Sequence, residues 1–368
     1  MDVTPRAPAS SGTSTLTCSG TPSRLTSSKG APISAASRSC SVTETSRPPK
    51  SIPTSAVTTS NRRTGRAIRG RSSVVRAAPK PPKPRARWHS PLSNPENSRK
   101  VSEVTFRIER GQGEATPLIV EIPHAGLRVD AESLAFCIAP GRAIGQDADL
   151  YVDELYQDAT AHGATRIVAE MSRYVCDLNR HEADYDADTA VGGRSDASAF
   201  GVVWRRTTEG YPALRAPLPK SELERRLSRF YHPYHKALRE LIDETRRRFG
   251  YALVLCAHSM PSLGRGGEAR ADVVPGTRGR TSASPAVIAL VERVCENFGY
   301  TWVHDQPYRG GFSTEHYGRP AEGVHAVQVE LARRLYMDEG TLAKNSGFED
   351  CRRFCSELVH SLAAFPRP

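Results

Sequence analysis

The chain has 368 residues and a formal net charge of +11. Residues 1–100 hold 18 Lys and Arg against 3 Asp and Glu, whereas residues 101–368 hold 33 against 37. Residues 101–368 are therefore slightly acidic overall, and their net charge gives no reason to expect that they bind nucleic acid. No stretch of the chain approaches the roughly 20 apolar residues of a membrane span, so we expect no membrane partner.

Residues 1–100 are rich in Ser, Thr, Pro, Arg and Ala and have no sustained apolar period. They cannot bury enough apolar surface to offset the entropy cost of ordering, so we expect a disordered tail. Three functions are compatible with this composition: a transit peptide, a basic arm that binds nucleic acid, and an extension without a structural role. We expect one folded domain over residues 101–368, which is long enough for a sizeable core.

In the folded part, short apolar runs alternate with longer amphipathic segments. The apolar runs predict strands at 103–109, 117–123, 165–170, 251–257, 300–304 and 324–331, and the amphipathic segments predict helices at 146–162, 220–249, 284–298 and 340–364. This alternation predicts the α/β class, with a mixed or parallel sheet covered by helices on both faces. The stretch 180–219 has little periodicity, so we expect a long loop that covers an active site.

Two of the predicted strands are followed directly by a histidine. The run 117–123 is followed by His124, and the run 251–257 is followed by His258. Open α/β sheets place their ligands at the carboxyl ends of the strands, so both imidazoles should reach the same edge. Two imidazoles at one edge are the beginning of a metal site, and an acid should supply the third ligand.

The candidates for the third ligand lie in the segment 145–156, which contains Asp147, Asp149 and Asp153. An acid at this position could instead cap the helix predicted there. Two histidines and one carboxylate that leave a position open are the usual composition of a hydrolytic zinc site. We therefore expect Asp149 as the third ligand, with Asp147 as the alternative.

The segment 173–180 contains a second polar cluster. The Arg fork matches a carboxylate with two hydrogen bonds, and a neighbouring Asn can donate to the same anion, so Arg173, Asn179 and Arg180 are candidate substrate-binding residues. The alternative is a surface salt bridge of Asp177 with Arg173 or Arg180.

Three candidates follow later in the chain. Arg309 precedes two glycines in a loop where the backbone can approach a ligand, and His316 in the same region could touch substrate. Glu330 lies near the end of the predicted strand 324–331, on the same side as Gln328. An acid beside a metal at a strand edge is placed to act as general base, although alone it could be a helix N-terminal acid.

These segments together resemble the N-formylglutamate amidohydrolases. The resemblance covers about residues 115–340 in one order, and its most specific part is the long block 308–331. The other matching segments are Ile122-Pro-His124-Ala-Gly126, Asp147-Ala-Asp149, Ser172-Arg-Tyr-Val-Cys-Asp-Leu-Asn-Arg180, Tyr234-His235 and Gly250-Tyr-Ala-Leu-Val-Leu-Cys-Ala-His-Ser259.

The resemblance implies a fold like that of the zinc carboxypeptidases, a three-layer α/β/α sandwich around a mixed, mostly parallel sheet. It implies His124, His258 and an acid of the Asp147/Asp149 pair as ligands of Zn²⁺ or another divalent metal. It further implies Asn179 and Arg180 as a carboxylate clamp and Glu330 as base.

The implied activity is hydrolysis of N-formyl-L-glutamate to formate and L-glutamate, a reaction of histidine degradation. A different N-acyl amino acid is an alternative substrate. A second alternative is a protein that binds nucleic acid through its basic tail. The eight cysteines form no CxxC pair, so we expect a reducing cytoplasm.

We predict that residues 1–100 are dispensable, because their composition provides no core. Limited proteolysis should leave a stable fragment that begins between about residues 101 and 115 and retains the amidohydrolase activity of the full chain. Unfolding of the fragment or loss of its activity would show that the domain begins earlier.

Overall fold

The computed structural model describes residues 104–367, so the predicted tail and the predicted domain start at residue 101 lie outside the described part. Its centre is a six-stranded sheet with the strand order β1-β3-β2-β4-β6-β5. The strands are β1 (Phe106–Glu109), β2 (Leu118–Ile122), β3 (Thr165–Ala169), β4 (Ala252–Met260), β5 (Val273–Gly276) and β6 (Val324–Ala332).

The sheet is mixed and mostly parallel. Strands β3, β2, β4 and β6 run parallel to one another, and β1 and β5 pair antiparallel at the two edges. In the pairing of β4 with β6, His258 lies opposite Glu330. The sheet therefore brings a predicted metal ligand and the predicted base to neighbouring positions.

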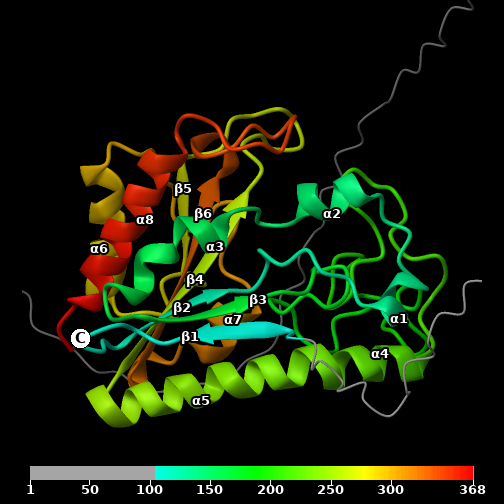
Figure 1. Cartoon of the computed structure of the whole chain (residues 1–368), viewed down its shortest axis with the longest axis horizontal. Coiled ribbons are helices and arrows are strands. Elements are labelled where there is room, and N and C mark those ends of the chain that lie inside the picture. Colours follow the sequence, from blue (N-terminus) through cyan, green and yellow to red (C-terminus); the bar gives the residue numbers. More distant parts are fainter. Residues whose placement is uncertain (1–103, 368) are drawn as a thin grey trace, which may run out of the picture. The chain divides into compact units, whose positions relative to one another are not determined.

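Helices cover both faces of the sheet (Figure 1). The short α3 (Val152–Leu155) packs on one face with α6 (Pro285–Asn297) and α8 (Phe348–Ala363). The opposite face carries α5 (His232–Phe249) and α7 (Phe312–Tyr317). The predicted three-layer α/β/α architecture is confirmed.

The alternation of side chains along β4 explains why both faces are covered. All nine residues of β4 are buried. Leu253 and Leu255 belong to the apolar core beneath α6 and α8, whereas Val254 and Cys256 belong to the core beneath α5. Because successive side chains of a strand point to opposite faces, a strand that is apolar at every position needs a helix layer on each side.

One predicted strand at the edge of the sheet was wrong, and one observed edge strand was missed. Residues 300–304 form no strand and contribute one bridge, between Trp302 and Val273. The edge strand is instead β5, which the sequence analysis missed because it has only four residues and contains Pro275. A proline is tolerated there because an edge strand needs fewer backbone donors.

Two of the four predicted helices are interrupted, and the other two differ from the observed helices at their ends. The predicted helix 146–162 is broken into the end of α2 (Gly141–Asp147), α3 and the 3₁₀ turn Gln157–Thr160. The predicted helix 220–249 is α4 (Lys220–Arg226), a π-helical turn at Leu227–Tyr231 and α5. The predicted helix 340–364 begins at Phe348, and α1 (Ala131–Leu134) and α7 were missed because both are short.

The segment 180–219 contains no named helix or strand, as expected for a long loop.

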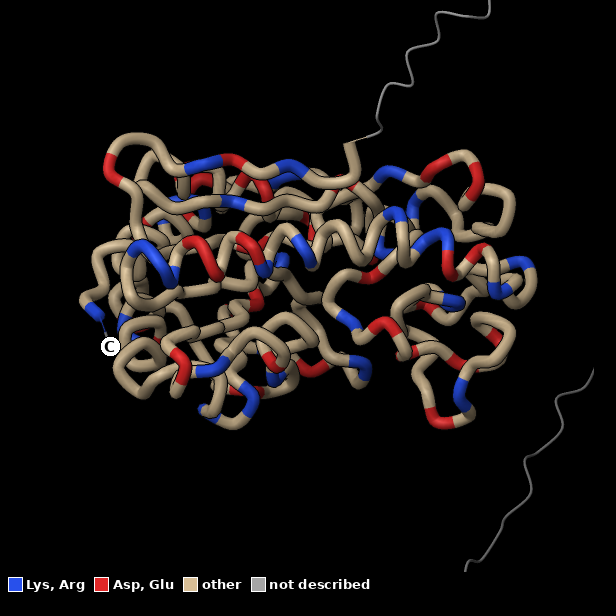
Figure 2. Tube along the Cα trace, turned by 90° about the horizontal axis from the view of Figure 1, so that it is seen from below, with Lys and Arg blue, Asp and Glu red and all other residues tan. Residues whose placement is uncertain are grey.

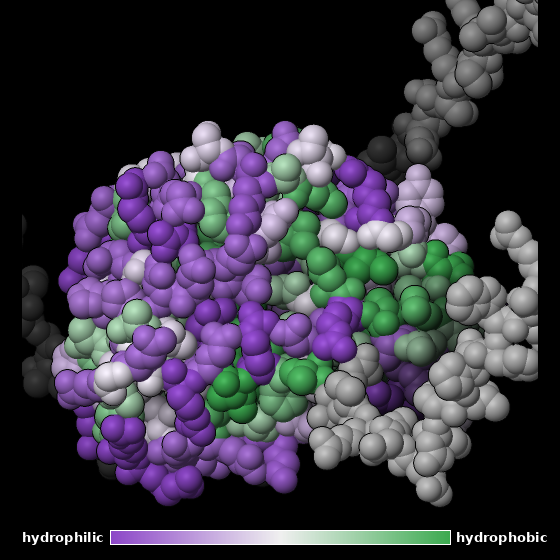
Figure 3. Space-filling model, in the orientation of Figure 1, coloured by the Kyte–Doolittle hydropathy of each residue, from purple (hydrophilic) through white to green (hydrophobic). Residues whose placement is uncertain are grey.

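Apolar surface gathers on the right of the view in Figure 3, where α1 lies in Figure 1. Exposed apolar side chains of this region include Leu127, Leu134 and Ile138. Figure 2 shows Lys and Arg interspersed with Asp and Glu along the trace. Among the described helices, none has the length and apolarity to span a bilayer.

The close approach of two loops at the carboxyl ends of β2 and β3 leads to a stability prediction. A Cβ added at Gly126 would lie 2.4 Å from the backbone carbon of Glu170 and 2.7 Å from the nitrogen of Met171. Gly126→Ala should therefore lower the free energy of unfolding by about 1–3 kcal/mol, measured by urea denaturation.

Gly141→Ala is the matched control, because a Cβ at this position in α2 meets no atom within 4 Å. Its stability should be unchanged or slightly higher. Equal stability of the two variants would show that the loops at Gly126 can separate without cost.

Candidate metal centre and active site

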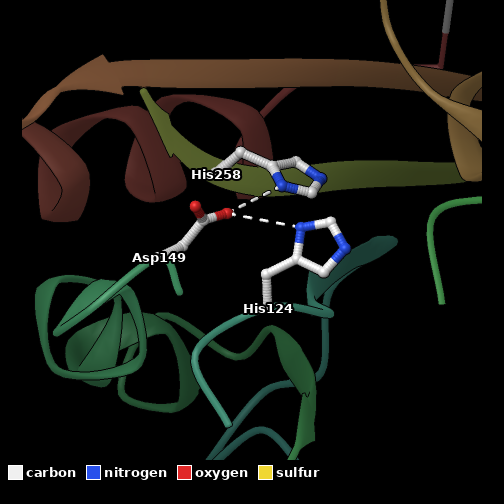
Figure 4. A group of neighbouring side chains, drawn as sticks. All are labelled: His124, Asp149 and His258. Carbon is white, nitrogen blue, oxygen red and sulfur yellow. Dashed lines mark hydrogen bonds and ion pairs between the residues drawn. The ribbon is translucent and has the colours of Figure 1, made fainter. Parts of the chain in front are cut away.

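Three side chains from three parts of the chain meet at the carboxyl edge of the sheet (Figure 4). His124 follows β2, His258 lies within β4, and Asp149 lies in the turn between α2 and α3. One potential ligand atom of each residue lies within 4.8 Å of the others, and all three residues are buried. The strand β4 continues to Met260, so His258 lies inside the strand and not at its end.

The ring nitrogens of both histidines face the same carboxylate oxygen. Nδ1 of His258 lies 3.0 Å from Oδ2 of Asp149, and Nδ1 of His124 lies 3.5 Å from the same atom. Nδ1 of His124 is buried and has no hydrogen-bond partner among the described residues. An unpartnered buried nitrogen beside a second imidazole and a carboxylate fits a divalent cation, because a cation would satisfy all three groups.

The electrostatics of the cluster favour the ionised acid. Burial opposes ionisation of Asp149, but the adjoining imidazoles outweigh it and hold the pKa of Asp149 well below its usual range. Burial also lowers the pKa of His258 and so favours its neutral form. An ionised carboxylate and a neutral imidazole are the protonation states that bind metal ions. Despite burial, Asp177 and Asp149 raise the pKa of His124, so a metal ion would displace a proton from that ring.

Asp177 orients His124. Its Oδ1 lies 2.7 Å from Nε2 of His124, and its Oδ2 accepts hydrogen bonds from Nη2 of Arg173 and Nε1 of Trp204, both at 2.9 Å. These contacts hold the ring so that Nδ1 faces Asp149. The salt bridge between Asp177 and Arg173 that the sequence suggested does exist, but Asp177 is fully buried and the pair is not a surface pair.

Asp147, the alternative third ligand, lies outside the cluster. The hydroxyl groups of Tyr174 and Thr208 donate to its carboxylate, and the backbone nitrogen of Thr208 donates at 3.1 Å. Thr208 belongs to the segment 180–219, so Asp147 anchors that long loop. Of the two acids, only Asp149 lies with the histidine pair.

Arg333 holds the turn that carries Asp149. Its guanidinium donates to the carbonyl oxygens of Gln146 at 2.6 Å and Ala148 at 2.7 Å, and it lies 3.5 Å from Oδ1 of Asp149. The sequence analysis missed Arg333, because nothing near it in the chain signals a contact with a turn almost two hundred positions away.

Glu330 projects from β6 beside the cluster. It is buried, and Nε2 of Gln328 donates to its Oε1 at 2.8 Å. Burial and the negative charge of Asp149 raise the pKa of Glu330 well above its usual value. A carboxylate with a raised pKa is better suited to accept a proton than an ordinary one.

The residues of the predicted carboxylate clamp differ in their contacts. Nδ2 of Asn179 lies 3.1 Å from Nε2 of His258, and Oδ1 of Asn179 accepts a hydrogen bond from the backbone nitrogen of Ser313. Among the described residues, the guanidinium of Arg180 has no hydrogen bond or ion pair. Of the two arginines in the segment 173–180, Arg173 is committed to Asp177, which leaves Arg180 available for a ligand.

A cavity of about 380 Å³ opens over these groups, a volume within the range of small-molecule sites. Eight of the nine predicted site residues line it: His124, Asp149, Arg173, Asn179, Arg180, His258, Arg309 and Glu330. The ninth, His316, does not. It lies on α7 and stacks on Phe312 with ring centroids 4.8 Å apart, because the helix turns its side chain away from the cavity.

The cavity wall also contains residues that the sequence analysis did not single out. Trp204 and Thr208 come from the long loop, Arg278 comes from the loop between β5 and α6, and Tyr308 comes from the loop between α6 and α7. The expectation that 180–219 contributes to the cover of an active site is consistent with the first two positions.

Comparisons with known proteins identify the family to which the chain is similar. The family model described as N-formylglutamate amidohydrolase matches residues 116–337. An N-formylglutamate deformylase from Pseudomonas putida is 37% identical over 231 residues, which are 61% of this chain and 82% of that protein. An N-formylglutamate deformylase from Pseudomonas aeruginosa is 36% identical over 261 residues, which are 68% of this chain and 94% of that protein.

A solved structure is similar in fold. The crystal structure of N-formylglutamate amidohydrolase from Ralstonia eutropha JMP134 matches 70% of this chain and 97% of its own, with a TM-score of 0.65 and 30% sequence identity.

Proposed function

The chain belongs to the N-formylglutamate amidohydrolase family and is an amide-hydrolysing enzyme, and from this premise we propose that it hydrolyses N-formyl-L-glutamate to formate and L-glutamate with a divalent metal ion. The observation that carries the proposal is the buried group of His124, Asp149 and His258, which lies in one cavity with Glu330 and the unpaired Arg180.

The metal would be held by His124, Asp149 and His258. Two nitrogen ligands and one carboxylate favour Zn²⁺ over the harder cations that prefer oxygen. When bound there, such a cation supplies Lewis-acid polarisation of the formyl carbonyl and lowers the pKa of water. Asp177 supports the site by fixing His124, and Arg333 supports it by fixing the turn of Asp149.

Glu330 would act as general base. It takes a proton from the attacking water and passes it to the amide nitrogen as the bond between the formyl carbon and that nitrogen breaks. Its position opposite His258, a proposed metal ligand on the neighbouring strand, supports this role. The hydrogen bond from Gln328 fixes which way the carboxylate points.

Asn179 and Arg180 would bind the α-carboxylate of the substrate, and Arg309 would contribute at the other side of the cavity. A guanidinium without a partner in the protein can form two parallel hydrogen bonds to a carboxylate. Holding that carboxylate fixes the formyl group over the catalytic residues, which lowers the entropy cost of reaction. Arg173 acts indirectly, through Asp177, and His316 is left out of the proposed site.

A different N-acyl amino acid remains the second candidate substrate, because the metal ligands and the clamp require only an amide and an α-carboxylate. We further propose a role in histidine degradation and a location in a reducing cytoplasm, with which the six free cysteines of residues 104–367 agree. The alternative of nucleic-acid binding rests on residues 1–100, outside the described part.

The proposal predicts that the full chain binds about one zinc ion and releases formate from N-formyl-L-glutamate. Loss of a residue that only orients a metal ligand typically lowers metal affinity roughly 10- to 100-fold. His258→Ala and Asp149→Asn remove a ligand itself, so they should lower zinc affinity by more than this and should abolish formate release. Zinc content after dialysis and a coupled formate assay measure both effects.

Asp147→Asn is the matched control, because Asp147 is an equally buried acid two positions away that contacts Tyr174 and Thr208. It should retain zinc. Full zinc occupancy in His258→Ala would contradict the proposed metal site, and loss of zinc in Asp147→Asn alone would move the third ligand to Asp147.

Two further variants separate binding from chemistry. Arg180→Lys should mainly raise KM, because a point charge replaces a planar fork in an interaction that is present before and during reaction. Glu330→Gln should lower kcat by roughly 10² to 10⁴ with little change in KM, because proton transfer occurs only during reaction. Both variants should retain zinc, and a Glu330→Gln variant with wild-type kcat would require another base.

A further inference from the structure

A turn with unusual backbone geometry borders the catalytic cavity. Three consecutive residues, Arg278, Gly279 and Arg280, have positive φ angles of 55°, 79° and 64°. Only glycine adopts this conformation freely, so the two arginines are held in a strained backbone. Such strain persists only where surrounding contacts enforce it, and it gathers at functional sites.

Asp305 enforces the turn. Its two carboxylate oxygens accept hydrogen bonds from the backbone nitrogens of Thr277 at 2.7 Å and Gly279 at 2.6 Å. Asp305 itself has a φ angle of 61°, and the nitrogen of Arg278 donates to the carbonyl oxygen of Arg309 at 2.7 Å. The turn is thus tied to the loop that carries Arg309.

This arrangement places two cations side by side at the rim of the cavity. Arg278 and Arg309 both line the catalytic cavity and both also line an adjoining surface groove. Nη2 of Arg309 lies against the turn, 3.3 Å from the position that a Cβ at Gly279 would occupy. Two neighbouring positive charges repel each other, and an anion between them would relieve the repulsion.

Within residues 104–367, neither arginine has a buried ion pair, and the one backbone contact of their guanidinium groups is a hydrogen bond from Nη1 of Arg278 to the carbonyl oxygen of Gly310 at 3.2 Å. Arg309 forms no side-chain hydrogen bond or ion pair with the described residues. Arg278 pairs with Glu315 at 2.6 Å, but the side chains are 34% and 59% exposed, so solvent screens the pair and a ligand can replace it. The other cavity arginines are Arg173, which is bound to Asp177, Arg333, which is bound to Asp149, and the unpaired Arg180.

We propose that Arg278 and Arg309 form a second carboxylate site. This site binds the side-chain carboxylate of a dicarboxylic N-acyl amino acid, while Arg180 binds its α-carboxylate. This inference rests on the proposed function and assigns the residues that select an acidic side chain, since a neutral side chain would offer these two cations no charge of opposite sign. Asp305 is the positioning residue of this site, because it fixes the turn without lining the cavity.

The test compares N-formyl-L-glutamate with N-formyl-L-glutamine, which differ in one charge at nearly equal size. Arg278→Gln and Arg309→Gln should each lower kcat/KM for the glutamate substrate about 10- to 100-fold more than for the glutamine substrate, as expected for a lost hydrogen bond to a charged group. Arg180→Gln should lower kcat/KM for both substrates to a similar extent, because both carry the α-carboxylate.

Arg280→Gln is the matched control. Arg280 has the same strained backbone but lies outside the catalytic cavity and pairs with Glu292 at 2.5 Å. It should leave both substrates unaffected. Equal losses on the two substrates in Arg278→Gln and Arg309→Gln, or equal hydrolysis of the two substrates by the wild-type chain, would overturn the carboxylate site.

Binding of L-glutamate and L-glutamine, measured by calorimetry on the zinc-loaded full chain, tests the same site without turnover. The wild-type chain should prefer L-glutamate, and Arg278→Gln and Arg309→Gln should reduce that preference at least tenfold. Preference for L-glutamate without formate release would contradict the proposed reaction and support the rim site. Formate release without this preference would contradict the rim site and support the reaction.

Discussion

The burial of several charged side chains at one edge of the sheet is the constraint on which the rest of the structure depends. Asp149, Asp177 and Glu330 are 2%, 0% and 6% exposed. A buried charge without a partner destabilises a fold by several kcal/mol, so each acid must be compensated where it lies. Arg173 compensates Asp177 and Arg333 compensates Asp149, and in doing so they fix the geometry of the two histidines. In the described part of the chain Glu330 has no such ion pair, and burial and the charge of Asp149 raise its pKa instead.

The parallel strands at the centre of the sheet bring these buried groups together at one site. Because β2, β4 and β6 are adjacent and parallel, the residues near their carboxyl ends converge from three distant parts of the sequence. The helices on both faces exclude water from the strands beneath, and the long loop 180–219 closes the cavity from the side with Trp204 and Thr208. Polar groups therefore meet in a place of low dielectric, where their interactions are strong.

The sequence predicted the parts of this arrangement that local patterns carry. Long apolar runs predicted β2, β4 and β6, and His124 and His258 predicted which edge of the sheet carries the site. It missed β5, which is short and contains a proline, and it left Asp147 open as the alternative to Asp149, because the role of Asp147 depends on Tyr174 and Thr208 farther along the chain. The sequence analysis did not identify Arg278 as a cavity residue for the same reason, because its position at the rim depends on Asp305 and on the loop of Arg309.

The contact between Trp204 and Asp177 places a fluorescent side chain beside the proposed metal centre. The indole nitrogen donates to the carboxylate that orients His124, and the guanidinium of Arg173 lies 4.1 Å from the centre of the ring. The excited state of indole has a large dipole, so nearby charges shift its emission. Of the two described tryptophans, Trp204 lines the cavity and Trp302 does not. The intrinsic fluorescence of the chain therefore contains a native probe of events at His124, without an attached dye.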